Sequence, residues 1–546
     1  MTTLTTESER LASPSGVAAA APDLGALRLA IDRSCALPCI AFFASSLFWL
    51  LFGSLAALIA SVKLHHPDFL GQWGWLTFGR VRPVHLNAVA YGWASMAAIG
   101  TLLWLMCRLS QVPLRFPALL VVAAMVWNVG VAWGCVEILA GNSTGIEWLE
   151  FPSRCAFLLF VTFAIIATWS VITFAGRKPE HVYVSQWYMF GALFWFPWLY
   201  ATVQVLLLIM PVKGVTQASI NWWFGHNVLG LWFTPVGLAT VYYLLPKVIG
   251  RPIYSYYLSI VGFWTLALFY NWAGAHHLIS GPIPAWLATV SIVGSVMMFI
   301  PVLTVAVNHH MTTKGHFGLL RYSPTLRFIV FGAMSYTAVS IQGSLMSPRI
   351  FNEPTHFTHH TIAHAHLGLY AFFSMIMFGA MYYIIPRLTG REWASAGLIR
   401  VHFWTVSVGV LLMFVGLTIG GAIQGFEMNQ SSRALWVDIR EHGLIGGLSA
   451  WFGGFQRQNG AVPFMDIVKG MRPWLMFRSV TGILMTIGHV AFFILVFINV
   501  HGWARGRTPG KPTLFVPEDD EYARLTGRTN GHGDTPPTPA TPEGHA

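Results

Sequence analysis

The sequence predicts an all-α membrane protein with twelve transmembrane helices. Of its 546 residues, 55% are hydrophobic and only 10% are charged, whereas soluble domains carry about 25% charged residues. The mean hydropathy is +0.59. In lipid, only helices and closed barrels satisfy their backbone hydrogen bonds, and apolar runs of about 20 residues match helices that cross a ~30 Å hydrocarbon core.

Twelve apolar runs have this length, and we expect them to form one continuous helical domain over residues 31–502. The flanking segments, 1–30 and 503–546, are rich in Ser, Thr, Ala, Pro and Gly, and we expect both to be disordered. The expected spans are 38–62, 84–107, 116–140, 153–175, 183–211, 222–246, 254–280, 284–307, 325–345, 362–386, 401–424 and 474–500.

The basic residues indicate which way the chain crosses the membrane. An even number of spans places both termini on one side, and the loops of that side are rich in Lys and Arg. This bias predicts cytoplasmic termini in the inner membrane of a bacterium, and it accounts for much of the net charge of +11 without a nucleic-acid partner. The loops on the side of the termini hold Arg108, Arg115, Arg177, Lys178, Lys247, Arg251, Lys314, Arg321, Arg327, Arg387, Arg391 and Arg400. On the opposite side, the first loop holds Lys63, Arg80 and Arg82, and the four later loops hold only Arg154, Lys213 and Arg349.

Histidines inside the predicted spans are the clearest functional signal, because ionisable side chains in a bilayer usually serve a pathway or a site. The adjacent pair His276 and His277 lies in an apolar stretch, and two imidazoles cannot close a metal shell alone. Further histidines that can complete it are His85, His226, His364 and His366. Together they predict a redox metal centre in the membrane.

His364 and His366 are two residues apart, which on a helix turns them through about 200°. They therefore point to opposite sides and can each hold a different haem iron. A low-spin haem needs a second axial histidine, and His85 in the second span is the candidate. Arg82, one turn away, can pair with haem propionates.

A high-spin haem on His364 would leave its other face open to a second metal held by His226, His276 and His277. Three imidazoles suit copper, zinc or iron, so the ligand set alone does not choose among them. Tyr270 precedes His277 by seven residues, two helical turns along one face. A phenol there can supply an electron and a proton; the other interpretation is a tyrosine packed between helices.

At these residues the chain closely resembles subunit I of the cbb3-type (C-family) haem-copper cytochrome c oxidases, over about 80–500. Five motifs carry the resemblance, and their spacing also agrees. They are Arg82-Pro-x-His-x-Asn87, Trp222-Trp-x-Gly-His226-Asn227, Arg251-Pro-x-Tyr-Ser-Tyr256, Tyr270-x-Trp-Ala-Gly-x-His-His277 and Thr361-Ile-x-His-x-His366.

The resemblance implies the haem-copper oxidase subunit I fold and a role for each motif residue. His85 and His366 would hold a low-spin haem b, His364 the high-spin haem b3, and His226, His276 and His277 the copper CuB. Tyr270 would be the tyrosine cross-linked to His226. Further implied positions are Tyr242 and Ser259 on the proton path, Glu147 or Glu150 near a calcium site, and Arg478 as a propionate partner.

The implied activity is four-electron reduction of O2 to water, coupled to proton uptake. Because the chain has no C-x-x-C-H motif for attaching haem c, electrons would come from membrane-anchored c-type cytochrome subunits or soluble cytochrome c. Three departures from the family pattern bear on proton pumping and on haem potential. Gly262 replaces a proton-path histidine, Gln342 replaces a buried glutamate, and His359 replaces an aspartate.

Two other functions fit parts of the pattern. A nitric oxide reductase would place non-haem iron at the triple-histidine site, with a glutamate one turn after the first histidine; Gly230 occupies that position, and Tyr270 is retained. A membrane haem protein that only transfers electrons or senses gas would not need His226, His276 and His277. We therefore favour the oxidase.

The remaining conspicuous residues receive structural interpretations. We expect the five cysteines (35, 39, 107, 135 and 155) to pack in the helices, and His402, His489 and the pair His309–His310 to be packing or interfacial residues. The longer segments 141–152 and 427–473 lie on the outer side. The second is predicted to be either a lid or partner-docking surface, or a plain connector.

Overall fold

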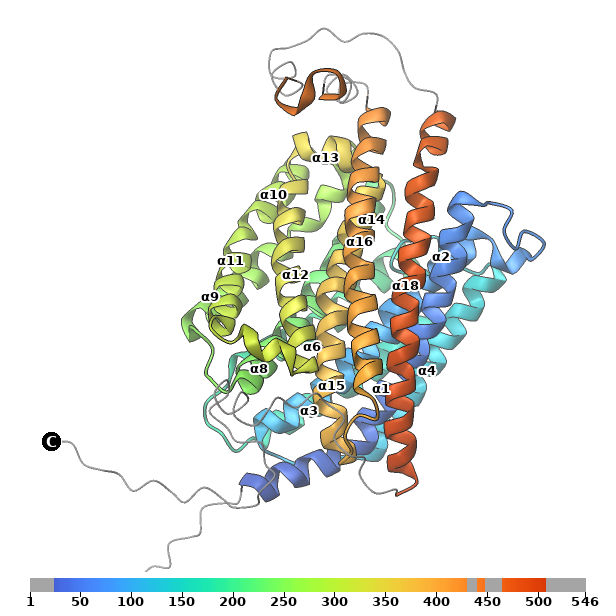
Figure 1. The fold of residues 1–546 in the computed structure, drawn as a ribbon. Helices are drawn as coiled ribbons and strands as arrows, with labels where there is room; N and C mark the ends of the chain where they lie inside the picture. Colours follow the sequence, from blue (N-terminus) through green and yellow to red (C-terminus); the bar gives the residue numbers. More distant parts are fainter. Residues whose placement is uncertain (1–23, 430–438, 447–463, 507–546) are drawn as a thin grey trace, which may run out of the picture.

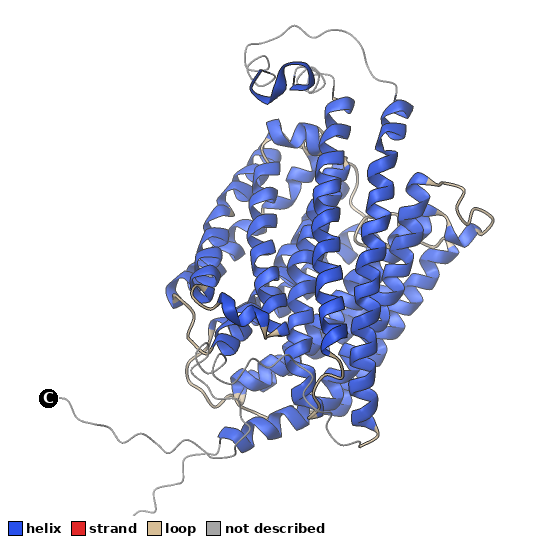
Figure 2. Ribbon diagram, viewed as in Figure 1, coloured by secondary structure: helices blue, strands red, loops and turns tan. Residues whose placement is uncertain are grey.

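The computed structural model describes residues 24–429, 439–446 and 464–506 (Figure 1). Throughout these residues the regular structure is helical, and the helices run side by side as a bundle (Figure 2). Eleven helices in the described part of the chain are long and apolar enough to cross a membrane. The protein is therefore an integral membrane protein, as its composition predicts.

Six spans are single helices, and the other five contain a π-helical stretch or, between α10 and α11, an interruption at Met298. The single helices are α1 (Leu24–His65), α4 (Pro117–Ala140), α5 (Ser153–Ala175), α12 (Pro324–Met346), α16 (Ala396–Met428) and α18 (Phe464–Ala504). The composite spans are α2 (Phe78–Asn87), η2 (Ala88–Ala94) and α3 (Ser95–Ser110); α6 (Val184–Gln204) and η3 (Val205–Ile209); α7 (Val215–Val228), η4 (Leu229–Phe233) and α8 (Thr234–Ile249); α10 (Ala285–Met297) and α11 (Phe299–Thr313); and α14 (His359–His366), η7 (Leu367–Ser374) and α15 (Met375–Thr389).

The expected seventh span, 254–280, differs from a single long helix. Its α-helix α9 (Tyr256–Tyr270) ends at Tyr270, and the chain then forms the short 3-10 helix η5 (Ala273–Leu278) that carries the histidine pair. α9 is thus the twelfth apolar segment, although it is too short to be counted with the eleven. The expectation that Tyr270 and His277 share one face of a continuous α-helix is wrong, because the helix breaks between them.

Serines set where several helices begin. The hydroxyl of Ser255 accepts a hydrogen bond from the Leu258 amide at 3.3 Å at the start of α9. Ser395 caps α16 in the same way, through the amide of Leu398 at 3.2 Å. Such caps satisfy amides that have no partner within the helix, so the apolar runs begin where a hydroxyl is available.

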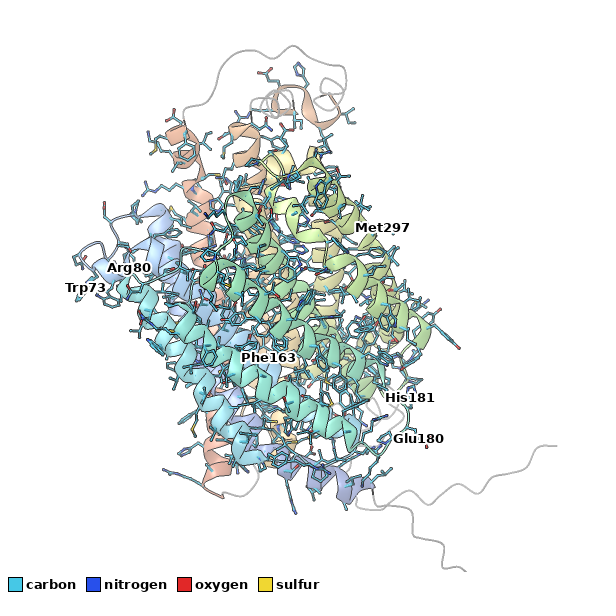
Figure 3. All side chains as sticks on the ribbon, turned by 180° about the vertical axis from the view of Figure 1, so that it is seen from behind. Trp73, Arg80, Phe163, Glu180, His181 and Met297 are labelled. Atoms are coloured by element: carbon cyan, nitrogen blue, oxygen red, sulfur yellow. The ribbon has the colours of Figure 1, made fainter. Side chains whose placement is uncertain are left out.

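The ends of the described chain lie at the same end of the bundle, where α1 begins at Leu24 and α18 ends (Figure 1). Residues 24–30, which we expected in the disordered N-terminal segment, are therefore part of α1. The loops divide between the two ends: Trp73 and Arg80 lie towards one end, and Glu180 and His181 lie at the other (Figure 3).

Three composite spans carry predicted ligand histidines, and each contains a π-helical stretch that begins three residues after one of them. η2 begins after His85, η4 after His226 and η7 after His364. π-helical insertions widen a helix locally and often occur at functional sites.

Tryptophan–serine hydrogen bonds join these π-helical stretches. The indole of Trp232 in η4 donates to Ser95 at 3.2 Å, and Ser95 donates to the Ala90 carbonyl in η2 at 2.8 Å. The indole of Trp93 in η2 donates to Ser374 at 2.9 Å, and Ser374 donates to the Leu369 carbonyl at 2.9 Å. The three histidine-bearing spans are thus held together just beyond their histidines.

Candidate metal centre

His226, His276 and His277 converge, although they come from two separate elements, α7 and η5. Their nearest ring nitrogens all lie within 4.8 Å of one another. Within the described part of the chain, this is the only such group of three or more His, Cys, Asp or Glu side chains. One ion can therefore reach three neutral nitrogen donors, as the sequence predicts.

A close approach between η5 and α7 brings the histidines together. At Gly274 an added Cβ atom would lie 2.6 Å from the Trp222 carbonyl oxygen and 3.2 Å from the His226 Cβ. Only glycine fits there. The same approach lets the His277 ring stack on the indole of Trp222, with ring centroids 4.1 Å apart.

Hydrogen bonding fixes which nitrogen of His276 can bind a metal. Ser295 donates its single hydroxyl proton to the Ser291 carbonyl at 2.8 Å, so its oxygen accepts from His276 Nδ1–H, also at 2.8 Å. The Nε2 lone pair is then free, because a neutral imidazole carries one N–H. At His226 the buried Nδ1 has no hydrogen-bond partner among the described residues. These donors fit a copper ion.

Tyr270 packs against this site from the end of α9. Its ring stacks on the His226 imidazole, with centroids 4.5 Å apart and planes 27° apart. The ring also occupies the space beside Gly230: an added Cβ at that glycine would lie only 1.7 Å from Tyr270 Cε1. The chain can therefore carry this tyrosine or a side chain at position 230, but not both in this arrangement.

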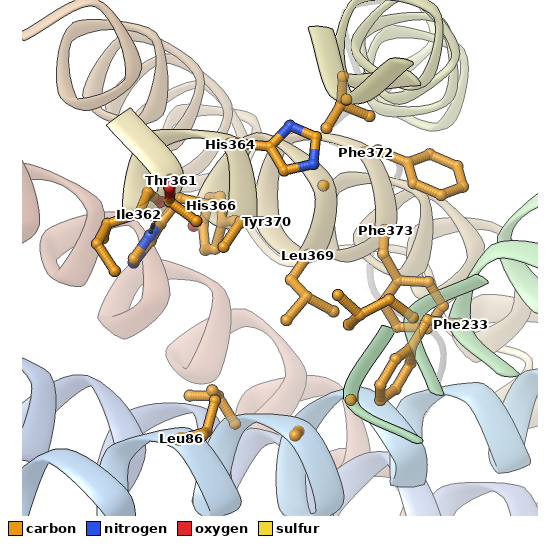
Figure 4. Close-up of a pocket in the computed structure, with 18 of the residues that line it drawn as sticks. Leu86, Phe233, Thr361, Ile362, His364, His366, Leu369, Tyr370, Phe372 and Phe373 are labelled. Carbon is orange, nitrogen blue, oxygen red and sulfur yellow. Dashed lines mark hydrogen bonds between the residues drawn. The ribbon is translucent and has the colours of Figure 1, made fainter. Parts of the chain in front are cut away.

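His364 and His366 project from different sides of α14, as their spacing predicts (Figure 4). His364 Nδ1 donates to Gln342 Oε1 at 3.3 Å. His366 Nδ1 donates to the Ile362 carbonyl at 2.8 Å. Both tautomers leave Nε2 free to ligate an iron.

His85 on α2 is held in the same way from another helix. Its Nδ1 donates to the Gly53 carbonyl of α1 at 2.9 Å, which again leaves Nε2 free. His85 and His366 line the same pocket as His364 and the three converging histidines. This pocket extends between the helices and is lined mainly by apolar side chains, and its imidazoles suit haem iron.

Arg82, Glu147 and Glu150 form one network at the end of the pocket. Arg82 Nη2 contacts Glu147 Oε1 at 2.5 Å, and Nη1 lies 3.8 Å from Glu150. Asn87 Nδ2 donates to Glu150 at 3.0 Å. Burial raises the pKa of Glu150 to about 7. The arginine that we expected on a propionate is thus engaged by Glu147, while Arg478 also lines the pocket.

The residues predicted for a proton path lie on α8 and α9. Tyr242 is fully buried and stacks on Tyr188, with centroids 5.7 Å apart. Ser259 is also buried and donates to the Tyr256 carbonyl at 2.5 Å. At Gly262 an added Cβ would lie 3.1 Å from Thr304 Oγ1 and 3.3 Å from Tyr188 Oη. The hydroxyls of half-buried Thr304 and buried Tyr188 therefore lie next to the position of the missing histidine.

Two histidines that we interpreted as packing residues lie beside predicted site residues or line the pocket. His309 is 2% exposed, and its ring lies 4.8 Å from that of Tyr242. His489 lines the pocket and is hydrogen-bonded at both ring nitrogens. Neither stands within a sequence motif that we could interpret, so no signal in the sequence distinguishes them from other membrane histidines.

The other expectations have simpler outcomes. All five cysteines are buried and free. His402 is buried and bonded to the Tyr382 hydroxyl at 2.9 Å, as a packing residue would be. Segment 141–152 lies against the pocket through Glu147 and Trp148. The interpretation of 427–473 falls largely on 430–438 and 447–463, outside the described residues.

Comparison with known proteins gives consistent matches. Residues 38–484 match the family model described as cytochrome c and quinol oxidase polypeptide I. The chain is 31% identical to the cbb3-type cytochrome c oxidase subunit CcoN1 of Stutzerimonas stutzeri, over 74% of this chain and 85% of that protein. It is 30% identical to cytochrome c oxidase subunit 1 of Rhodobacter capsulatus, over 81% of each.

A solved structure has the same fold. The cryo-EM structure of a heme-copper terminal oxidase dimer superposes with a TM-score of 0.65 at 15% identity, covering 89% of this chain and 85% of that one. The predicted subunit I fold is therefore confirmed.

Proposed function

Because this chain belongs to the cytochrome c and quinol oxidase polypeptide I family, with cbb3-type relatives, we propose that it reduces O2 to water at a haem b3–CuB centre. Family membership makes it an oxidoreductase of the cytochrome c oxidase kind, with haem and copper as cofactors. The proposal adds which residues hold these cofactors, the identity of the haems, and the route of electrons and protons.

The position of Tyr270 carries the choice of O2 over nitric oxide. Reduction of nitric oxide would call for iron, which favours an added carboxylate one turn after His226. The Tyr270 ring fills that space: a Cβ at Gly230 would meet it at 1.7 Å. The three donors are therefore all imidazoles, a set that suits copper, with a phenol beside them.

The proposed ligands follow from the free ring nitrogens. His226, His276 and His277 would hold copper, and His364 would hold the high-spin haem iron. His85 and His366 would hold the low-spin haem b. When bound, these groups supply the electron-transfer and oxygen-reducing chemistry. The chain fixes their geometry, because Ser295, Gln342 and backbone carbonyls orient the ligands.

Tyr270 would be the residue that delivers a proton and an electron to the reacting oxygen. Its ring stacks on His226, and both line the pocket. A cross-link between the two rings, which the resemblance implies, would keep the phenol in this place. Its hydroxyl is then a fixed proton source in a site that excludes bulk water.

Protons would reach the pocket along Tyr242 and Ser259, and we include His309 in this path. His309 is buried against Tyr242, and neither of its ring nitrogens has a hydrogen-bond partner among the described residues. Buried polar atoms are rarely left unpaired, and a proton-carrying position is one explanation. His309 would supply the imidazole that Gly262 cannot, from the neighbouring helix α11.

Moving the imidazole from position 309 to position 262 tests this proton path. The change His309→Gly should slow oxidase turnover by on the order of 100-fold, the scale of a lost proton-transfer group. Adding Gly262→His should restore most of the rate, since position 262 faces Thr304 and Tyr188. His310→Ala, half-buried next to it, is the control and should retain activity. Unchanged turnover in His309→Gly would remove His309 from the path.

Partners and location follow the family but are not fixed by the fold. We propose that c-type cytochrome subunits or a soluble cytochrome c deliver electrons on the side of Arg82 and Glu147. The excess of Lys and Arg in the opposite loops supports cytoplasmic termini in a bacterial inner membrane. A calcium ion near Glu147 or Glu150 stays a prediction, because Arg82 and Asn87 engage these carboxylates.

Metal analysis of the purified protein tests the function directly. We expect two haems and one copper per chain, a bis-histidine haem spectrum, and O2 consumption with reduced cytochrome c that Tyr270→Phe abolishes. Non-haem iron in place of copper, together with N2O production from nitric oxide, would contradict the proposal.

A further inference from the structure

A Ser–His–Tyr hydrogen-bond chain crosses three spans on the wall of the pocket. His489 on α18 bonds through Nε2 to the Tyr370 hydroxyl of η7 at 2.5 Å and through Nδ1 to the Ser54 hydroxyl of α1 at 2.8 Å. All three residues line the pocket. None of them belongs to a motif that predicted a site.

The donor of each hydrogen bond between Ser54, His489 and Tyr370 follows from the number of protons that each group carries. Ser54 donates its hydroxyl proton to the Leu50 carbonyl at 2.7 Å, so its oxygen accepts from His489 Nδ1–H. A neutral imidazole has one N–H, so Nε2 accepts from Tyr370. His489 is therefore neutral in this arrangement, and its Nε2 is the one atom that can take a further proton.

This hydrogen-bond chain connects α1, which presents the carbonyl that orients His85, with η7, which continues the helix that carries His366. Ser54 directly follows Gly53, whose carbonyl orients His85. Tyr370 follows His366 by four residues and lies on the same side of the helix (Figure 4). The His489 side chain thus bonds to Ser54, next to the carbonyl that orients His85, and to Tyr370, four residues after His366.

The surroundings leave few other groups to respond to a charge in this part of the pocket. The titratable or charged groups that face His489 are Tyr370 from η7 and His402 from α16, and the charged residues that line the pocket are Arg82, Glu147 and Arg478. α1 contributes only the Ser54 hydroxyl. An electron placed in a region of low dielectric attracts a proton strongly to the nearest base.

We propose that His489 binds one proton when the low-spin haem is reduced and releases it when the haem is oxidised. When one electron from the cytochrome c donor reduces the haem that His85 and His366 would hold, one proton taken up from solvent would join His489 Nε2. Tyr370 then turns from donor to acceptor, and its hydroxyl proton points into the pocket, so no partner loses its hydrogen bond. Oxidation reverses both transfers. The inference rests on the proposed ligation by His85 and His366.

A neighbouring buried pair that does not line the pocket supplies a matched control. His402 is bonded to the Tyr382 hydroxyl at 2.9 Å, as His489 is bonded to Tyr370. However, neither His402 nor Tyr382 lines the pocket. A purely structural role for buried His–Tyr pairs would make the two histidines equivalent.

Redox titration of the low-spin haem, followed by its visible spectrum between pH 6 and 9, tests the proposal on the whole oxidase. In the unmodified protein the midpoint potential should fall as pH rises. His489→Gln keeps hydrogen bonding but cannot take the proton, so this slope should disappear, as should proton uptake measured with a pH dye on reduction. Tyr370→Phe should weaken the slope, and His402→Gln should preserve it.

The outcomes separate this inference from the function on which it rests. A spectrum without a bis-histidine haem would overturn the proposed ligands. A bis-histidine haem whose slope is absent in the unmodified protein, or equal in His489→Gln, would overturn the proton site alone. If His489→Gln does not assemble, an unchanged slope in Tyr370→Phe has the same consequence.

Discussion

The ligands of the two halves of the pocket are oriented by different kinds of group. At His85 and His366, Nδ1 bonds to backbone carbonyls, those of Gly53 and Ile362. At His276 and His364, Nδ1 bonds to side chains, those of Ser295 and Gln342. The half proposed for electron entry is thus anchored by groups common to every residue, whereas the half proposed for oxygen chemistry is anchored by groups that a mutation can change.

This difference teaches where the chain can be tuned. A carbonyl acceptor belongs to the backbone of the helix that presents it, so a side-chain substitution does not remove it. A hydroxyl or amide acceptor changes its strength, charge and reach with a single substitution. The orientation of His276 and His364 should therefore respond to mutation of Ser295 and Gln342, whereas no single side-chain substitution removes the carbonyl acceptors of His85 and His366.

The largest effect should come from removing a converging ligand. His276→Ala leaves two imidazoles, so copper binding and O2 reduction should each fall by about 100-fold or more. Copper content per haem and O2 uptake measure this loss. The spectrum of the low-spin haem should persist; if it disappears as well, the two halves are not independent.

A smaller effect should follow from removing the support of that ligand. Ser295→Ala leaves His276 Nδ1–H without its acceptor, which should weaken copper binding by about 10-fold. Competition with a copper chelator measures the affinity. Thr289→Ala, an exposed residue on the same helix bonded to the Ala285 carbonyl, should have no effect. Equal losses in both variants would indicate general damage to α10.

The finest test changes only the charge of one acceptor. In Gln342→Glu a carboxylate would accept from His364 Nδ1–H, and a charged acceptor strengthens such a bond by about 1 kcal/mol. The reduction potential of the haem on His364 should therefore fall by about 40 mV. The haem on His85 and His366 serves as an internal control in the same titration. A shift of both haems together would contradict the comparison.

The sequence predicted which histidines line the pocket better than it predicted what surrounds them. Spacing alone placed His364 and His366 on opposite sides of a helix, because that geometry is local. Their places in apolar spans singled out the other four histidines and Tyr270, and motif resemblance implied a role for each. The hydrogen-bond acceptors could not be predicted, since Gly53 is 32 residues from His85 and Gln342 is 22 residues from His364. Such pairings are set by helix packing, which a single sequence does not display.

The break in the helix after Tyr270 was not predicted from the sequence either. Hydrophobic periodicity treats 254–280 as one helix, but the chain breaks after Tyr270 so that η5 can press Gly274 against α7. Arg82 lies one turn from His85, where we expect a propionate partner, and its pairing with Glu147, 65 residues away, was not predicted. In both cases a contact distant in sequence decides the outcome.

The π-helical stretches beyond His85, His226 and His364 give each of these spans a point where the winding changes. At such a stretch the hydrogen bonds run from residue i to i+5, so the helix continues with a changed winding. Trp232 and Trp93, bonded to Ser95 and Ser374, join the three π-helical stretches to one another. When a haem enters during assembly, the segments that carry His85, His226 and His364 would therefore adjust together.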